Sequence, residues 1–240
     1  MSTANVNLAR RLTAEFLGSA LLAAVVIGSG IAAQRLSPSD TGLQLLENAL
    51  ATALALPVLI LLFATVSGAH FNPVVSLVDS ALGLRAWRDT ALYIPSQIAG
   101  CIGGAALANL MFGLPAVAFS TTDRIAPQTF LAEIVATAGL VLVIFALART
   151  GRAHLTAAAV GAYIGAAYFF TSSTSFANPA ITVGRMFSDT FAGIAPASGP
   201  GFIAAQLLGG ALGLLLVRWF FPSVTLESGV AQPAARLAQR

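Results

Sequence analysis

The sequence predicts an all-α membrane protein with six transmembrane helices and two half-helices arranged as an inverted repeat. Three observations lead to this fold class: the composition, the number of long apolar runs, and a set of motifs that occurs twice. Of the 240 residues, 57% are hydrophobic and only 9% are charged, whereas about a quarter of the residues of a soluble domain are charged. So few charges leave too little polar surface to cover a soluble globule.

Six apolar runs are long enough to cross a bilayer, which takes about 20 residues of helix. They cover approximately residues 12–33, 48–66, 90–112, 129–148, 155–170 and 201–221. The first run is longer than the apolar core of a signal peptide, so we expect it to be retained as a helix. The flanking arginines alternate between two groups of loops, which predicts cytoplasmic termini and an even number of spans under the positive-inside rule.

Two further segments, residues 70–82 and 177–189, are too short to cross the membrane. Each contains an Asn-Pro box; the two boxes are Asn72-Pro73-Val74 and Asn178-Pro179-Ala180. Asparagine is a strong N-cap, and proline is favoured at the first helical position. The segments are therefore predicted to be short helices that begin inside the protein. Irregular backbone at membrane depth is tolerated only where it is buried in protein or lines a cavity, which indicates a pore.

Three marker residues recur in the same order in the two halves of the chain. The corresponding pairs are Glu15 and Glu133, Asn72 and Asn178, and Gln97 and Gln206. Each half has three spans, so the second copy enters the membrane from the opposite face, and the functional site of such a repeat lies near the midplane. The two Asn-Pro helices then meet with their N-termini together, and their dipoles repel cations.

This organisation predicts one channel domain over residues 1–222, followed by a cytoplasmic tail over 223–240. Repeat one covers about residues 10–112, and repeat two covers about 129–222.

Several polar residues within the spans are candidate functional residues. Glu15 and Glu133 form either a proton relay or a pair of acceptors for the backbone of the two irregular loops, and their matched placement favours the second interpretation. Gln97 and Gln206 are predicted to brace the same loops, because an amide both donates and accepts. His70 is predicted to line the pore on the cytoplasmic side of the central constriction.

Paired Asn-Pro boxes within an inverted repeat resemble the major intrinsic protein family, which comprises the aquaporins and aquaglyceroporins. The resemblance covers about residues 10–222 and includes SGAHFNPV at 67–74 and SFANPA at 175–180. It implies the aquaporin fold, a homotetramer with one pore per protomer, and passage of small uncharged solutes. It also implies a multi-pass protein in the lipid of a bacterial inner membrane, with both termini cytoplasmic.

The sequence departs from the family pattern at two positions. Val74 replaces the alanine of the first box and is expected to alter the width of the central contact. Ile181 follows the second box, where the family usually has an arginine in its selectivity filter. By correspondence with the family, the other filter positions are Thr52, Ser175 and a fifth-span residue that is either Ala166 or Tyr168. With Ala166, the ring is small, weakly polar and uncharged.

The second box and the segment DTFAGI at 189–194 resemble bacterial members of the family found in arsenic-resistance clusters. The resemblance implies conduction of arsenous acid and glycerol-like polyols, with water as a further candidate. A water-selective aquaporin and a proton-coupled secondary transporter remain alternatives. Arg185 shares a helix face with Ile181, and its guanidinium is expected in the outer pore mouth. The alternatives are an arginine that reaches out to the membrane interface and one that pairs with Asp189.

Other function classes are disfavoured by the sequence. Its only two histidines, His70 and His154, lie in different segments without a nucleophile or metal motif, so we expect no enzymatic activity. A single cysteine, Cys101, excludes a multi-cysteine metal site, and we expect neither a metal nor a cofactor. The arginines form no stripe that a nucleic acid would follow, so no nucleic-acid partner is expected.

Overall fold

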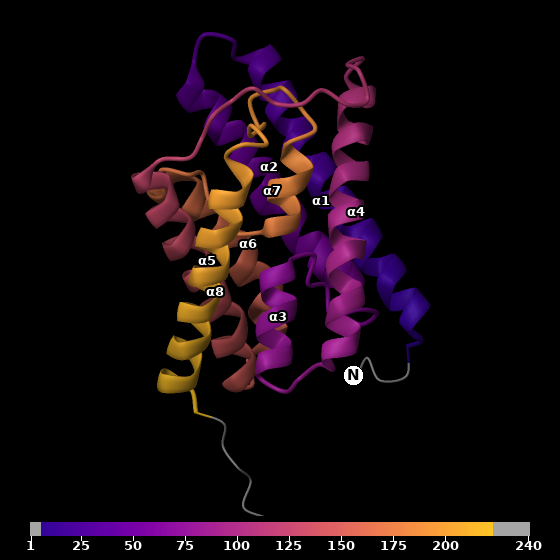
Figure 1. Cartoon of the computed structure of the whole chain (residues 1–240), viewed down its shortest axis with the longest axis vertical. Coiled ribbons are helices and arrows are strands. Elements are labelled where there is room, and N and C mark those ends of the chain that lie inside the picture. The colour runs from indigo at the N-terminus through magenta and orange to yellow at the C-terminus, as the bar shows by residue number, and fades with distance from the viewer. Residues whose placement is uncertain (1–5, 223–240) are drawn as a thin grey trace, which may run out of the picture.

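The computed structural model describes residues 6–222 and shows six long helices around two short ones (Figure 1). The first half contains α1 (Leu8–Leu36), α2 (Thr41–Phe63), α3 (Pro73–Ala81) and α4 (Trp87–Met111). The second half contains α5 (Pro127–Arg149), α6 (Thr156–Phe170), α7 (Pro179–Arg185) and α8 (Gly199–Phe220), with the single 3₁₀ turn η2 (Ala153–Leu155) before α6. Six helical segments are long and apolar enough to span a membrane, and the fifth of them is Ala153–Phe170, because η2 leads directly into α6. The predicted tail, residues 223–240, lies outside the described residues.

Corresponding helices pack against each other in the two halves. Helix α1 packs along α4, and the corresponding helices α5 and α8 pack along each other. Helices α2 and α6 join the halves, and each short helix contacts long helices from both halves. Helix α7 lies above α3 at the centre of the bundle, while the start of α1 and the end of α8 lie at the lower end (Figure 1). This arrangement places the two Asn-Pro boxes at the centre of the molecule.

Both short helices begin where the Asn-Pro boxes predict, but they end earlier than predicted. The side chain of Asn72 caps α3 by accepting from the backbone N–H of Val74 at 2.9 Å. Helix α7 ends at Arg185 because the carbonyl groups of Met186 and Phe187 instead accept hydrogen bonds from the segment that follows α4. The prediction that this helix extends to residue 189 is therefore wrong.

Glycines allow α1 and α4 to pack at backbone contact. A Cβ atom on Gly100 would lie 2.3 Å from the carbonyl oxygen of Phe16, and one on Gly104 would lie 2.1 Å from that of Ala20. In the second half, a Cβ on Gly209 would lie 2.5 Å from a backbone oxygen of α5. Small residues at such positions permit the close helix contacts that stabilise membrane proteins.

We expect Gly100→Ala to destabilise the protein by about 1–3 kcal/mol, because the added methyl group forces α1 and α4 apart. Gly103→Ala on the same helix is the matched control, since its Cβ would meet only the Phe16 ring, at 3.9 Å. Thermal unfolding of the purified protein in detergent measures the difference. Equal unfolding midpoints for the two variants would contradict the close-contact explanation.

Candidate functional site

The two short helices meet at their capped ends through a reciprocal pair of hydrogen bonds. Asn72 Nδ2 donates to the carbonyl oxygen of Ala177 at 2.7 Å, and Asn178 Nδ2 donates to that of Phe71 at 2.8 Å. Each amide nitrogen carries two hydrogens, so one donor on each asparagine is left for another acceptor. Both asparagines line the central cavity. The midpoint of the molecule therefore presents two fixed amide donors.

The loops that lead into the short helices have an unusual backbone. Ala69 and Phe71 in the first loop, and Ser175 and Ala177 in the second, adopt positive φ angles between 47° and 52°. L-residues in this region cost on the order of 1–3 kcal/mol and persist only where the surrounding structure holds them. This backbone turns the carbonyls of Phe71 and Ala177 toward the opposite asparagine.

Two buried carboxylates hold these loops in place. Glu133 accepts hydrogen bonds from the backbone N–H groups of Phe176 and Ala177 at 2.9 and 2.8 Å. It also accepts from Ser173 Oγ at 2.6 Å and from Gln206 Nε2 at 2.7 Å. All these donors belong to the second loop or to α8. The contacts tie the loop to helix α5.

The first half repeats this arrangement around Glu15. Its carboxylate accepts from the backbone N–H groups of His70 and Phe71 at 3.1 and 2.8 Å, and from Ser67 Oγ at 2.6 Å. Gln97 Nε2 donates to the same carboxylate at 2.7 Å. These four contacts tie the first loop to helices α1 and α4.

A cavity of about 1050 Å³, including the open solvent at its ends, is lined by residues from both halves. Thr52, Tyr168, Ser175 and Ile181 line it, and each is at most 4% exposed. Thr52 Oγ1 and the Tyr168 hydroxyl lie 3.1 Å apart in a hydrogen bond. Ser175 Oγ is buried without a hydrogen-bond partner.

The structure corrects two residues of the predicted pore lining. Ala166 is exposed on the outside of α6 and does not line the cavity, so of the two fifth-span candidates only Tyr168 lines it. Val74 points away from the cavity: it is buried against α8, where its Cγ1 fills the space beside Gly210. Val75 lines the cavity instead, so the valine of the first box does not set the width of the central contact.

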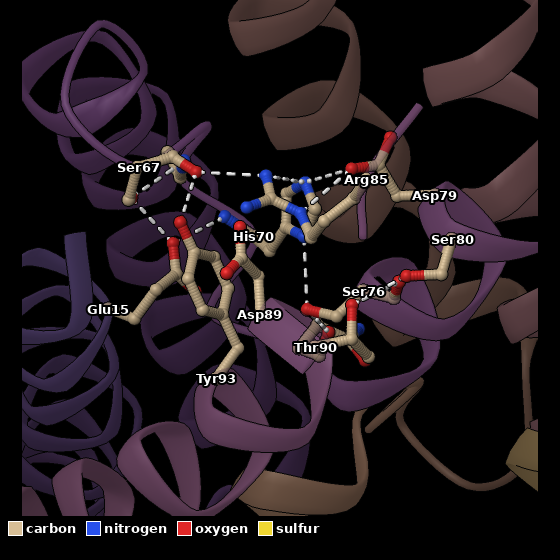
Figure 2. Close-up of polar contacts among 12 residues, drawn as sticks. Glu15, Ser67, His70, Ser76, Asp79, Ser80, Arg85, Asp89, Thr90 and Tyr93 are labelled. Atoms are coloured by element: carbon tan, nitrogen blue, oxygen red, sulfur yellow. Dashed lines mark hydrogen bonds and ion pairs between the residues drawn. The ribbon is translucent and has the colours of Figure 1, made fainter. Parts of the chain in front are cut away.

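His70 lies at the end of the cavity nearest α3, within a cluster of polar side chains (Figure 2). Its Nδ1 atom is 3.0 Å from Ser76 Oγ, and its Nε2 atom is 3.4 Å from Asp79 Oδ2. Arg85 Nε donates to the same Asp79 oxygen at 2.9 Å, and its guanidinium lies over the Tyr93 ring at 4.3 Å from the centroid. We call His70, Asp79 and Arg85 the inner cluster.

The sequence did not reveal the roles of two residues of the inner cluster. Arg85 lies in the loop between α3 and α4, yet it is largely buried and donates to the carbonyl oxygen of Ser67 at 3.0 Å. Asp79 lines the cavity, and its spacing from Asn72 equals that of Arg185 from Asn178. A comparison of the two repeats at this spacing would have identified Asp79 as a candidate residue.

Arg185 lines the opposite end of the cavity and is only 3% exposed. Its Nε donates to the carbonyl oxygen of Ala192, and its Cζ atom lies 3.5 Å from the centroid of the Phe176 ring. Asp189 accepts from Thr121 N at 2.9 Å instead. The alternative in which Arg185 pairs with Asp189 is therefore wrong, because that residue lies beyond the end of α7.

The segment at 189–194 that follows α7 holds two arginines through consecutive carbonyls. Arg124 donates to the carbonyl oxygens of Gly193 and Phe191 at 2.6 and 2.7 Å, on either side of the carbonyl that accepts from Arg185. Beside it, a hydrogen bond from the Ser198 hydroxyl lowers the pKa of Asp123. These contacts hold the segment after α4 against the segment after α7.

Across residues 6–222, no cluster of three or more potential metal ligands is found.

Comparison with known proteins gives consistent matches. The family model described as Major intrinsic protein matches residues 2–177. The aquaglyceroporin AqpS of Rhizobium meliloti (strain 1021) is 49% identical over 213 residues, which cover 89% of this chain and 91% of that protein. Aquaporin NIP1-3 of Oryza sativa subsp. japonica is 32% identical over 75% of this chain and 64% of its own length.

The fold also has a solved counterpart. The crystal structure of the aquaglyceroporin from Plasmodium falciparum superposes with a TM-score of 0.69 at 21% identity, covering 88% of this chain and 96% of that one. At this identity the similarity establishes the fold alone.

Proposed function

The chain belongs to the major intrinsic protein family, as a membrane-embedded passive channel for small solutes, and from that premise we propose that its cargo is arsenous acid and glycerol-like polyols. Both are small, uncharged near neutral pH and rich in hydroxyl groups. The observation that carries the proposal is that Thr52, Tyr168, Ser175 and Ile181, all uncharged, line the cavity, and we propose that they form the ring that selects the solute.

The ring favours such solutes for a physical reason. An arginine in a constriction supplies hydrogen-bond donors that replace the water around a solute, and it also occupies space. Ile181 supplies neither donors nor charge, and its apolar side chain suits the carbon backbone of a polyol. The Thr52 and Tyr168 hydroxyls and the unpartnered Ser175 hydroxyl offer hydrogen bonds on the other sides of the ring. The similarity to a relative named as an aquaglyceroporin supports the same class of solute.

We propose that residues 1–222 form one channel domain and that four copies assemble, each with its own pore, in the inner membrane of a bacterium. Both termini are placed in the cytoplasm by the distribution of arginines. The described ends of the chain lie at one end of the bundle (Figure 1), as this orientation requires. The end of the cavity with the inner cluster is then cytoplasmic, and the end with Arg185 faces outward.

Flux into proteoliposomes tests the proposed cargo. We expect glycerol and arsenous acid to enter at rates that rise linearly with their gradients and do not depend on a proton gradient. Swelling with water but with neither solute would favour a water-selective aquaporin and overturn the proposal. Saturable, proton-linked uptake would instead favour a secondary transporter. Protein-free liposomes give the background rate.

A further inference from the structure

One position in each repeat faces the cavity beyond the central asparagines. Asp79 and Arg185 both lie seven residues after the asparagine of their box, and both line the cavity. Each contacts the residue that lies two positions before that asparagine: Asp79 Oδ2 is 3.4 Å from His70 Nε2, and Arg185 Cζ is 3.5 Å from the Phe176 centroid. The inverted repeat therefore builds both pore mouths from the same pair of positions.

The two mouths differ in charge. Arg85 neutralises Asp79 through a 2.9 Å ion pair, so the inner cluster has little net charge when His70 is neutral. Arg185 has no such partner, because none of the ion pairs found among residues 6–222 includes it. A buried charge without a counter-ion is costly, and its retention beside a cavity indicates a functional role. The outer mouth therefore carries an uncompensated positive charge.

The surroundings of Arg185 hold its guanidinium in one place and leave part of it free. Helical side chains lean toward the helix N-terminus, so the guanidinium lies back over Phe176, which precedes α7. The Ala192 carbonyl accepts from Nε, and the backbone N–H of Ile194 donates to the Arg185 carbonyl at 3.2 Å. Within residues 6–222 no other hydrogen bond engages the guanidinium, so its two terminal nitrogens are available to a solute in the cavity.

Arg124 fixes the segment that carries this contact. Its two hydrogen bonds to the carbonyls of Phe191 and Gly193 hold the residues on either side of Ala192. The segment that accepts the hydrogen bond of Arg185 is therefore itself held by Arg124. Such support is what a precise solute contact requires.

We propose that Arg185 is the cationic selectivity contact of the outer mouth, where it binds neutral solutes that present two or more oxygen acceptors and repels cations. The proposal rests on the proposed channel function and refines its solute class. A planar guanidinium with two free nitrogens matches paired oxygens, as in a polyol or an undissociated oxyacid. Because the charge comes from position 185, the ring at Ile181 stays apolar while the pore keeps a barrier to cations.

The test compares two substitutions at this position with a matched control. Arg185→Gln removes the charge, and Arg185→Lys keeps the charge but loses the planar donors. Arg152→Gln is the control, because Arg152 is exposed and, within residues 6–222, its side chain donates only to Thr150 Oγ1, at 3.1 Å. Proteoliposomes report the Na⁺ flux and the ratio of glycerol to urea permeability, since urea presents a single oxygen.

We expect Arg185→Gln to raise the Na⁺ flux by roughly tenfold or more, the effect of one unit charge acting over a few ångströms in a partly desolvated site. It should also lower the glycerol-to-urea ratio. Arg185→Lys should keep Na⁺ excluded and lower the ratio, while Arg152→Gln should behave as the unsubstituted protein does.

Wild-type Na⁺ exclusion and a wild-type ratio in Arg185→Gln would overturn the assignment. Should that variant fail to fold, Arg185→Lys decides: an unchanged ratio overturns the assignment, and a lowered ratio with Na⁺ excluded supports it. A failure of the proposed function is a different result, because the unsubstituted protein would then pass neither glycerol nor arsenous acid.

Discussion

Ile181→Arg is expected to reduce glycerol and arsenous acid flux by roughly a hundredfold while water still crosses. Ile181 is buried and lines the same cavity as Thr52 and Tyr168. A longer side chain there occupies the space that a polyol needs, and a second cation near Arg185 orders water in the ring. A hundredfold change corresponds to about 2.7 kcal/mol in the barrier, which is within reach of steric exclusion combined with the loss of an apolar contact.

Stopped-flow swelling of proteoliposomes with water, glycerol and arsenous acid in turn measures this change. Ile181→Leu is the matched control, because it conserves volume and polarity, and such swaps are tolerated in packed sites. It should retain at least half of the glycerol flux. If Ile181→Arg passes glycerol as fast as the unsubstituted channel, the ring at Ile181 does not select the solute.

Glu133→Ala is expected to destabilise the protein by about 3–5 kcal/mol, because it leaves several buried hydrogen-bond donors unsatisfied. The substitution leaves four donors without an acceptor, including the backbone N–H groups of Phe176 and Ala177. An unsatisfied buried donor costs about 1–3 kcal/mol. The loop that carries Ser175 and Asn178 then loses its hold on α5, and conduction should fall together with stability.

Thermal unfolding in detergent and glycerol flux measure the effects of Glu133→Ala. Glu47→Ala is the control: this carboxylate is only partly buried, and its one hydrogen bond is the 2.9 Å contact from Ser37 Oγ, so its loss should cost about 1 kcal/mol. Glu133→Gln should be intermediate, because its amide keeps one acceptor oxygen. Equal midpoints for Glu133→Ala and Glu47→Ala would show that the second loop does not depend on Glu133.

The sequence predicted the six spans because a bilayer admits few alternatives to helices, and apolar length alone then locates them. It also predicted where the short helices begin, since Asn72 and Asn178 are strong caps followed by proline. The repeat was visible in the matched carboxylates Glu15 and Glu133. These signals lie in the identity and order of the residues along the chain, so they could be read without coordinates.

Which side chains point into the cavity could be determined only from the tertiary structure. Helix α6 is apolar on nearly every side, so its sequence did not indicate that Tyr168 faces the cavity and Ala166 faces outward. The same holds for Val74 and Val75, whose directions follow from the packing of α3 against α8.

Polar partners across the molecule were equally invisible in the sequence. Arg85 meets Asp79 after a turn that the apolar pattern does not encode, and Arg185 meets Phe176 because its side chain leans back toward the start of α7. Apolar length and helix caps are properties of the chain itself, and they determined the spans and the two boxes. The pore lining depends on how two halves pack against each other, and only the folded molecule contains that information.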